Sequence, residues 1–169
     1  FYASDGTCAV EIALKMSLHS RYHQNDHRRT KFICLENAYH GETLGALSLS
    51  DLGRFRDPYA SALQNPLVLK GLPYVSGTTD PLWHNCEPHW QAIEQQLTPL
   101  AETATAIIVE PIVQGAGGMK IYSPDFLKRL RKWSADHQVH LISDEIMTGI
   151  GRTGKMLAGE HAAVEADFV

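Results

Sequence analysis

The chain has 169 residues, of which 44% are hydrophobic and 20% are charged, and its formal net charge is −4. This length and composition are typical of one globular domain with a sizeable core. The lack of a basic run excludes the usual nucleic-acid-binding surface, and no apolar run approaches the ~20 residues that a membrane span needs.

The cysteines and histidines indicate the cellular compartment and whether a metal site is expected. The three cysteines are widely spaced and form no CxxC pair: Cys8, Cys34, Cys86. This pattern argues against a structural zinc site and a disulfide scaffold, and it favours the reducing cytoplasm. The nine histidines form no HExxH segment and have no acid cluster nearby, so we expect no metal site.

The first predicted elements are a helix, a strand and a shorter helix. An apolar stripe at helical spacing predicts a helix over 6–24, with Asp5 as a candidate cap. After a polar connection, the apolar run 32–35 suits a buried strand. We expect a loop over 36–42 and a short helix over 43–49.

Prolines and glycines crowd the middle of the chain. Residues 51–85 carry four prolines, and we expect a long, irregular surface excursion there. A helix is predicted over 87–103, where one face collects apolar side chains: Trp90, Ile93, Leu97. The β-branched run 106–109 has no polar alternation, as expected of a strand that is covered on both faces.

The last third contains a clear helix start and one more strand. The segment 123–125, Ser-Pro-Asp, is typical of an N-cap, a first helical position and an acidic first turn. One stripe then follows at helical spacing: Phe126, Leu130, Trp133, His137. The run 140–143 predicts a buried strand that ends at Asp144.

Strands alternate with helices of about ten residues or more, which argues for an α/β fold with a mostly parallel sheet and helices on both faces. In such sheets the loops that leave the carboxyl ends of the strands gather the ligand site. The unusual residues of this chain all follow predicted strands or open a helix. The two ends, 1–3 and 167–169, read as strands cut from a longer protein.

The segment Ser4-Asp5-Gly6-Thr7-Cys8 opens the first helix. A helix N-terminus offers free N–H groups and partial positive charge, Gly6 allows close backbone approach, and the Thr7 hydroxyl can donate. The segment therefore suits a phosphate. An ordinary capped helix start is the alternative, and no Walker motif follows.

Two loops carry candidate ring-binding groups. In the loop from Tyr39 to Thr43, an aromatic ring beside His40 can stack on a flat heterocycle; the alternative is a polar turn with a half-buried tyrosine. Glu110 ends a strand and opens a glycine-rich loop over 111–118. If it is buried it needs a cationic or hydrogen-bonded partner; otherwise it is a strand-end acid that faces water.

The run 141–154 is the most specific segment. Asp144 closes a buried apolar strand, where a carboxylate is costly unless a cation pairs with it. A protonated pyridine nitrogen is such a cation, and an aspartate that keeps it protonated lets the ring act as an electron sink. Ile146 can lie against one face of such a ring. An acidic strand-end loop remains the alternative.

These four segments, in this order, resemble those of the class III aminotransferases of fold type I, which use pyridoxal 5'-phosphate (PLP). The resemblance extends over nearly the whole chain and implies the large PLP-binding domain of that fold. Within the family, the loops at Tyr39 and Glu110 are most similar to the branch that acts in biotin biosynthesis. Met147, where many members have glutamine, fits the same branch.

The resemblance implies that three residues at the first helix bind the cofactor phosphate: Gly6, Thr7, Cys8. It places five more around the cofactor ring: Tyr39, His40, Glu110, Asp144, Ile146. Tyr39 would stack on the ring and also line the substrate site, whereas Asp144 would pair with the ring nitrogen. We expect these two to be catalytic, with Ile146 on the opposite ring face.

For that branch the resemblance implies a homodimer that transfers an amino group from S-adenosylmethionine to 8-amino-7-oxononanoate, giving 7,8-diaminononanoate. The Schiff-base lysine of the family lies beyond the strand that begins at Asp167, and none of the lysines in this chain stands in that position. We therefore expect residues 1–169 to be the central part of the large domain, without the small domain, and inactive by themselves.

Other functions stay open at this point. Another class III member, acting on ornithine, acetylornithine, 4-aminobutyrate or other ω-amines, would share these segments. A non-catalytic α/β module that binds a phosphate ligand would keep the pocket and need no lysine. A metal-dependent enzyme that uses the histidines is the third alternative.

Overall fold

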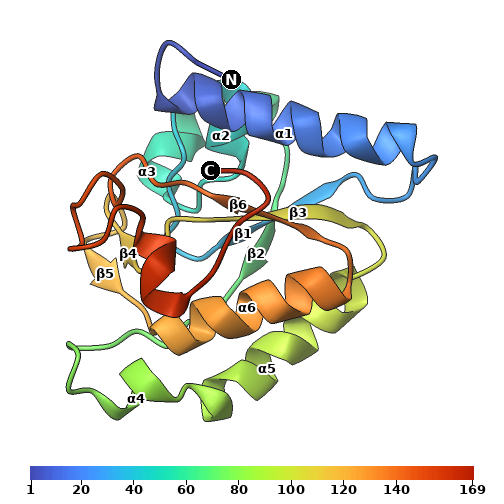
Figure 1. Cartoon of the computed structure of the whole chain (residues 1–169). Helices are drawn as coiled ribbons and strands as arrows, with labels where there is room; N and C mark the ends of the chain where they lie inside the picture. The colour runs from blue at the N-terminus through green and yellow to red at the C-terminus, as the bar shows by residue number, and fades with distance from the viewer.

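The computed structural model describes all 169 residues and contains a four-stranded parallel sheet with helices on both faces (Figure 1). Its strands follow the order β2-β1-β3-β6: β2 (Leu67–Leu69), β1 (Lys31–Leu35), β3 (Ala104–Val109), β6 (His140–Ser143). Two short strands, β4 (Val113–Gln114) and β5 (Lys120–Ile121), form a separate antiparallel hairpin. The expected α/β fold with a mostly parallel sheet is confirmed.

The helices divide between the two faces of the sheet. α1 (Gly6–His23) and α2 (Leu44–Ser48) lie on one face, and α5 (Glu87–Leu97) and α6 (Pro124–Asp136) lie on the other (Figure 1). Five shorter helical segments connect them: α3 (Gly53–Arg56), η1 (Asp57–Ala62), α4 (Pro81–His84), η2 (Thr98–Leu100), η3 (Ala158–Ala162). None of these helices combines the length and the hydropathy that crossing a membrane requires.

The central strand β3 explains how the core is divided. Alternate strand residues point to opposite faces, so Ile107 and Val109 pack with α5 and α6, whereas Ala106 and Ile108 pack with α1. All six residues of β3 are buried. The prediction of a strand covered on both faces is confirmed.

The start of α6 also follows the sequence prediction. The Ser123 hydroxyl accepts the N–H of Asp125 at 3.1 Å, and Pro124 takes the first helical position. Three members of the predicted stripe are buried: Phe126, Leu130, Trp133. The fourth, His137, is half-buried and caps the end of the helix, where it stacks on the indole of Trp133 at 4.4 Å.

Three expectations about elements are wrong. Residues 51–85 are not all irregular, because they contain β2, which pairs with β1; three residues are too few to show a periodic pattern. The helix predicted over 87–103 ends at Leu97, because Pro99 has no N–H to continue the hydrogen bonds of the helix and a 3₁₀ turn follows. Residues 1–3 are exposed and form no strand.

At the other end, residues 167–169 approach the outer edge of β6. Phe168 forms a parallel bridge with Ile142, and its carbonyl accepts the N–H of Ser143 at 2.8 Å. The start of a strand that was predicted there is therefore confirmed.

Candidate functional site

Three loops leave the carboxyl ends of the adjacent strands β1, β3 and β6, and each begins with or carries a polar side chain singled out in the sequence. His40 follows β1, Glu110 directly follows β3, and Asp144 directly follows β6. Because parallel strands present their carboxyl ends at one edge of the sheet, the three side chains come together. Side chains 104 residues apart in the chain are thus within hydrogen-bond distance.

His40 and Asp144 form a buried pair at the centre of this edge. The Nδ1 of His40 lies 2.8 Å from the Oδ2 of Asp144, and the two side chains are 0% and 6% exposed. Because a carboxylate can only accept, Nδ1 donates. The Oδ1 of Asp144 accepts the N–H of Ile146 at 3.2 Å, and the Nε2 of His40 is buried without any partner. Asp144 is therefore well out of bulk solvent, held by two neighbours.

Glu110 ties the loop after β1 to the glycine-rich loop. Its Oε1 accepts the N–H of Tyr39 at 3.1 Å, and its Oε2 accepts the N–H of Gly115 at 2.8 Å. Burial raises the pKa of Glu110 above its usual value, against the opposing effects of His40 and the two N–H donors. Glu110 is only 5% exposed, and its carboxyl group has the hydrogen-bonded partners that a buried acid requires.

Tyr39 stands at the rim of the same site. Its hydroxyl donates to Glu42 at 2.5 Å, and its ring lies 5.0 Å from the ring of Phe55. Burial, and then Glu42, raise the pKa of Tyr39 to about 12. The phenol therefore keeps its proton at neutral pH.

The start of α1 meets both loops. A Cβ added to Gly6 would lie 2.9 Å from the side chain of Ile146, and one added to Gly41 would lie 1.9 Å from the Thr7 hydroxyl. Gly41 also has a φ of +126°, which favours glycine. The first turn of the helix, the Tyr39 loop and the loop after Asp144 therefore form the walls of a single site. Ile146 is 75% exposed there and offers an open apolar surface.

Asp5 already caps this helix. Its carboxylate accepts the N–H of Cys8 at 2.8 Å and the thiol of Cys8 at 3.3 Å, which hold the pKa of Asp5 below its usual value. The N–H of Cys8 is thus committed to the cap. Phosphate binding by Gly6, Thr7 and Cys8 stays a prediction, in which Cys8 would have to exchange this bond.

Two further side chains at the site were not foreseen. The Ser50 hydroxyl accepts the N–H of His40 at 3.1 Å and fixes the backbone of the loop. Glu11 binds the end of the same loop at Thr43. The one signal in the sequence is that Glu11 follows Thr7 by four residues, which places both on one face of the helix.

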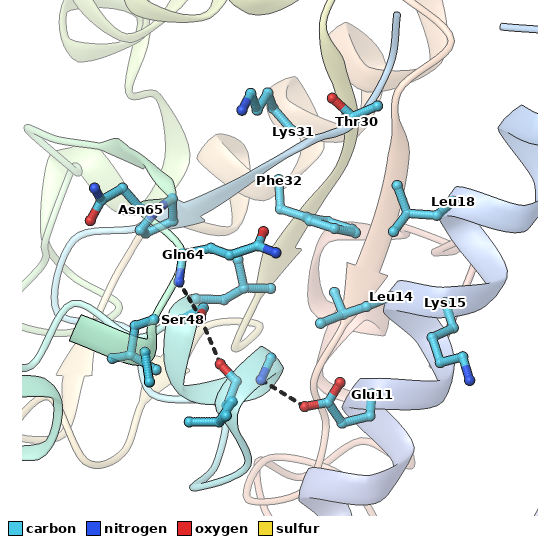
Figure 2. A pocket seen from close by; sticks show the side chains of 16 residues that line it. Glu11, Leu14, Lys15, Leu18, Thr30, Lys31, Phe32, Ser48, Gln64 and Asn65 are labelled. Carbon is cyan, nitrogen blue, oxygen red and sulfur yellow. Dashed lines mark hydrogen bonds between the residues drawn. The ribbon is translucent and has the colours of Figure 1, made fainter. Parts of the chain in front are cut away.

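Two cavities flank the site. One of about 780 Å³ borders it through Ile146 and is lined mostly by apolar side chains, such as Met119 and Met147. The other, of about 900 Å³, lies between α1, α2 and the start of β1; Glu11 and Phe32 line it, and none of the His40, Glu110 and Asp144 group does (Figure 2). No group of three or more His, Cys, Asp or Glu side chains is placed to hold a metal ion.

The sequence pattern of the class-III aminotransferases matches residues 1–169. The chain belongs to this family. The resemblance seen in the four segments is confirmed.

Curated relatives support a finer comparison. The chain is 43% identical over 170 residues to the adenosylmethionine-8-amino-7-oxononanoate aminotransferase of Helicobacter pylori, with 100% of the chain and 37% of the relative covered. It is 37% identical to the protein of the same name from Saccharomyces cerevisiae, with 95% and 35% covered. The chain thus spans less than two fifths of the length of these relatives.

Solved structures agree on the fold. An amine transaminase from an uncultivated Pseudomonas species, in its PLP-bound form, superposes with a TM-score of 0.84 at 32% identity, covering 98% of this chain and 38% of that one. The adenosylmethionine-8-amino-7-oxononanoate aminotransferase of Methanocaldococcus jannaschii superposes with a TM-score of 0.77 at 30% identity, covering 95% and 34%. This class-III chain therefore has the fold of transaminases of known structure.

Proposed function

We propose that the chain is the central part of the large domain of a PLP-dependent aminotransferase, which moves an amino group from S-adenosylmethionine to 8-amino-7-oxononanoate and yields 7,8-diaminononanoate. The observation that carries the proposal is the buried carboxylate of Asp144, held by His40 at the carboxyl edge of the sheet. Burial of an acid at this edge is costly unless it meets a cation. The pyridine nitrogen of PLP is such a cation.

The residues of the site fit the cofactor on three counts. The missing Cβ of Gly6 lets Ile146 pack directly on the start of α1, and the exposed side chain of Ile146 suits the face of an aromatic ring. Tyr39 provides an aromatic surface at the rim, and the buried Nε2 of His40 has no partner within the chain. When bound, PLP supplies an electron sink for bonds at the amino carbon.

The chain's own groups have distinct tasks in this proposal. Asp144 holds a proton on the ring nitrogen, and His40 keeps the Asp144 carboxylate in place through Nδ1. Tyr39 and Ile146 confine the ring between them, and Tyr39 also lines the substrate side. Thr7 and the first-turn N–H groups bind the phosphate. Glu110 joins the two loops by its hydrogen bonds and so keeps the Tyr39 ring in register with the sheet edge.

The choice of substrates is supported by the names of the curated relatives, two of which are at least 37% identical to this chain. A second candidate, a class-III transaminase acting on ω-amines such as ornithine, acetylornithine or 4-aminobutyrate, is favoured by one observation. An amine transaminase superposes with a TM-score of 0.84, above the 0.77 of the biotin-pathway enzyme.

Donor preference of the complete enzyme separates these candidates. We expect the purified enzyme, supplied with PLP and 8-amino-7-oxononanoate, to form 7,8-diaminononanoate with S-adenosylmethionine and none with glutamate or 1-phenylethylamine. The product is measured by mass spectrometry. Turnover with an ω-amine and none with S-adenosylmethionine would establish the second candidate instead.

The proposal includes a cytoplasmic homodimer and a catalytic lysine outside residues 1–169. The three cysteines are all free, which suits a reducing compartment. We expect light scattering of the complete enzyme to give twice the monomer mass. We also expect the isolated 169-residue segment to show no turnover above a boiled control; activity of the segment would contradict the assignment of the lysine.

A further inference from the structure

Glu11, on the second turn of α1, binds the end of the loop that carries Tyr39. Its Oε1 accepts three hydrogen bonds: from the Thr43 hydroxyl at 2.6 Å, the Gly45 N–H at 2.8 Å and the Ala46 N–H at 3.1 Å. Figure 2 shows the Glu11 side chain extending from α1 toward α2, with a dashed line for one of these bonds. A single carboxylate oxygen thus joins two separate elements.

The contact replaces a missing helix cap. Thr43 is the N-cap residue of α2, but its side chain makes no capping bond to the helix. The first N–H groups of a helix have no acceptor within it, and here Glu11 supplies that acceptor from α1. The short helix α2 therefore depends on α1 for its start.

Glu11 and Thr7 form one face of α1, because they are four residues apart. Thr7 meets the same loop: its Oγ1 lies 3.3 Å from the Oγ1 of Thr43 and would lie 1.9 Å from a Cβ on Gly41. The loop thus contacts α1 at two residues, Thr7 and Glu11. Thr7 is in the first turn, where the proposed phosphate site lies.

We propose that Glu11 is a positioning residue that holds the loop from Tyr39 to Thr43 against the start of α1. The proposal rests on the proposed function, since it assigns the phosphate to α1 and the ring to Tyr39. By fixing the loop on the helix, Glu11 sets the separation between these two groups. PLP, a rigid ring with a phosphate on a short arm, requires that separation to be constant.

Variants of the complete enzyme test this role. In Glu11→Ala all three acceptor bonds are lost, whereas the amide oxygen of Glu11→Gln can still accept them. Asp80→Ala is the matched control, because Asp80 likewise accepts two backbone N–H groups and caps the short helix α4, outside the site. Titration of the apoenzyme with PLP gives the affinity, and visible circular dichroism reports the orientation of the bound ring.

We expect Glu11→Ala to weaken PLP binding by about tenfold or more and to reduce the dichroism of the bound cofactor. Glu11→Gln should stay within about threefold of the parent, and Asp80→Ala should match the parent in both measurements. If Glu11→Ala is too unstable to purify, Thr43→Val replaces it. This variant removes the bond of the Thr43 hydroxyl to Glu11 and its contact with Thr7, keeps the two backbone bonds to Glu11, and should weaken binding by about threefold.

Three results would overturn the inference. The first is parent-like affinity and dichroism in Glu11→Ala, or in Thr43→Val if that is the variant used. The second is Glu11→Gln as defective as Glu11→Ala, since charge and not hydrogen bonding would then matter. The third is a parent enzyme that binds no PLP, which alone would also remove the proposed function, so the two failures are distinguishable.

Discussion

Asp144 illustrates how a single residue can depend on the whole sheet. It follows a strand whose last residues are buried, and its carboxylate is only 6% exposed. Removing a carboxylate from water costs several kcal/mol, and within the chain only one imidazole and one backbone N–H offset this. Such an environment is typical of functional acids, because stability alone would favour an apolar side chain at this position.

Asp144→Asn is the most direct test at this scale. The amide keeps the size and the contact with His40 but cannot hold a proton on a ring nitrogen. We expect the complete enzyme to remain folded and to lose turnover by about 100-fold or more, the equivalent of a broken buried ion pair. Steady-state kinetics and PLP titration measure this. Asp136→Asn, on an exposed carboxylate, is the control, and equal activity of the two variants would refute the role of Asp144.

Gly41→Ala tests the close contact between the Tyr39 loop and α1. Gly41 has a φ of +126°, a backbone conformation that is strained for any residue with a side chain. The new Cβ would also lie 1.9 Å from the Thr7 hydroxyl. We expect a loss of at least about 2 kcal/mol in the free energy of unfolding, measured by urea denaturation. Gly71→Ala, with φ +78° and open space around it, isolates the strain alone and should cost less. Equal losses would show that the contact with Thr7 is unimportant.

At the scale of elements, the helix α6 supports the sheet from the face opposite α1. It packs its apolar stripe in the larger core cluster, beneath β3 and β6. Its N-cap, Ser123, is fully buried, and the Ser123 hydroxyl also donates to the carbonyl of Trp83 at 3.2 Å. The cap therefore joins the start of α6 to the end of α4.

Ser123→Ala removes both bonds at once. We expect the free energy of unfolding of the complete enzyme to fall by about 1–2 kcal/mol, the range found for helix caps. Ser61→Ala, on an exposed serine in η1 whose hydroxyl makes no hydrogen bond, should change it by less than about 0.5 kcal/mol. Urea unfolding gives both values. A loss at Ser123 no larger than at Ser61 would mean that this cap is dispensable.

At the scale of the molecule, a polar cluster joins α1, β3 and β6 at the end of the sheet opposite the site. The Ser17 hydroxyl lies 2.8 Å from the Thr105 hydroxyl and 2.9 Å from the Nδ1 of His140. The buried Arg21 donates to the carbonyls of Thr105 and Gln138. Burial first, and then the charge of Arg21, lower the pKa of His140 below its ordinary 6.5, against the opposing charge of Asp167.

This shift predicts how stability depends on pH. Because His140 binds a proton less readily in the folded state than in the unfolded state, the unfolded state is favoured as the pH falls below about 6.5. We expect the melting temperature of the complete enzyme to fall between about pH 7 and 5, and His140→Gln to flatten that fall. Calorimetry at several pH values measures it. An unchanged slope in the variant would exclude His140 as the cause.

Much of the fold and of the site could be predicted from local patterns. The apolar run of β3, the capped start of α6 and the charged end of β6 each contain their signal within a few residues, and the structure confirms all three. The strand β2 escaped prediction because three residues carry no period, and only pairing with β1 makes it a strand. The helix predicted over 87–103 was too long, because its apolar stripe ends at Leu97 and Pro99 follows.

The sequence by itself determined which residue types stand at strand ends and helix starts, because burial patterns and backbone preferences are local properties. Only the tertiary structure decided which of them meet. The contact of His40 with Asp144 spans 104 residues, and that of Glu11 with Thr43 spans 32. Such pairs depend on the order of the strands and on where a loop packs against a helix. Both arise from packing of the whole chain, and neither produces a periodic pattern in the sequence.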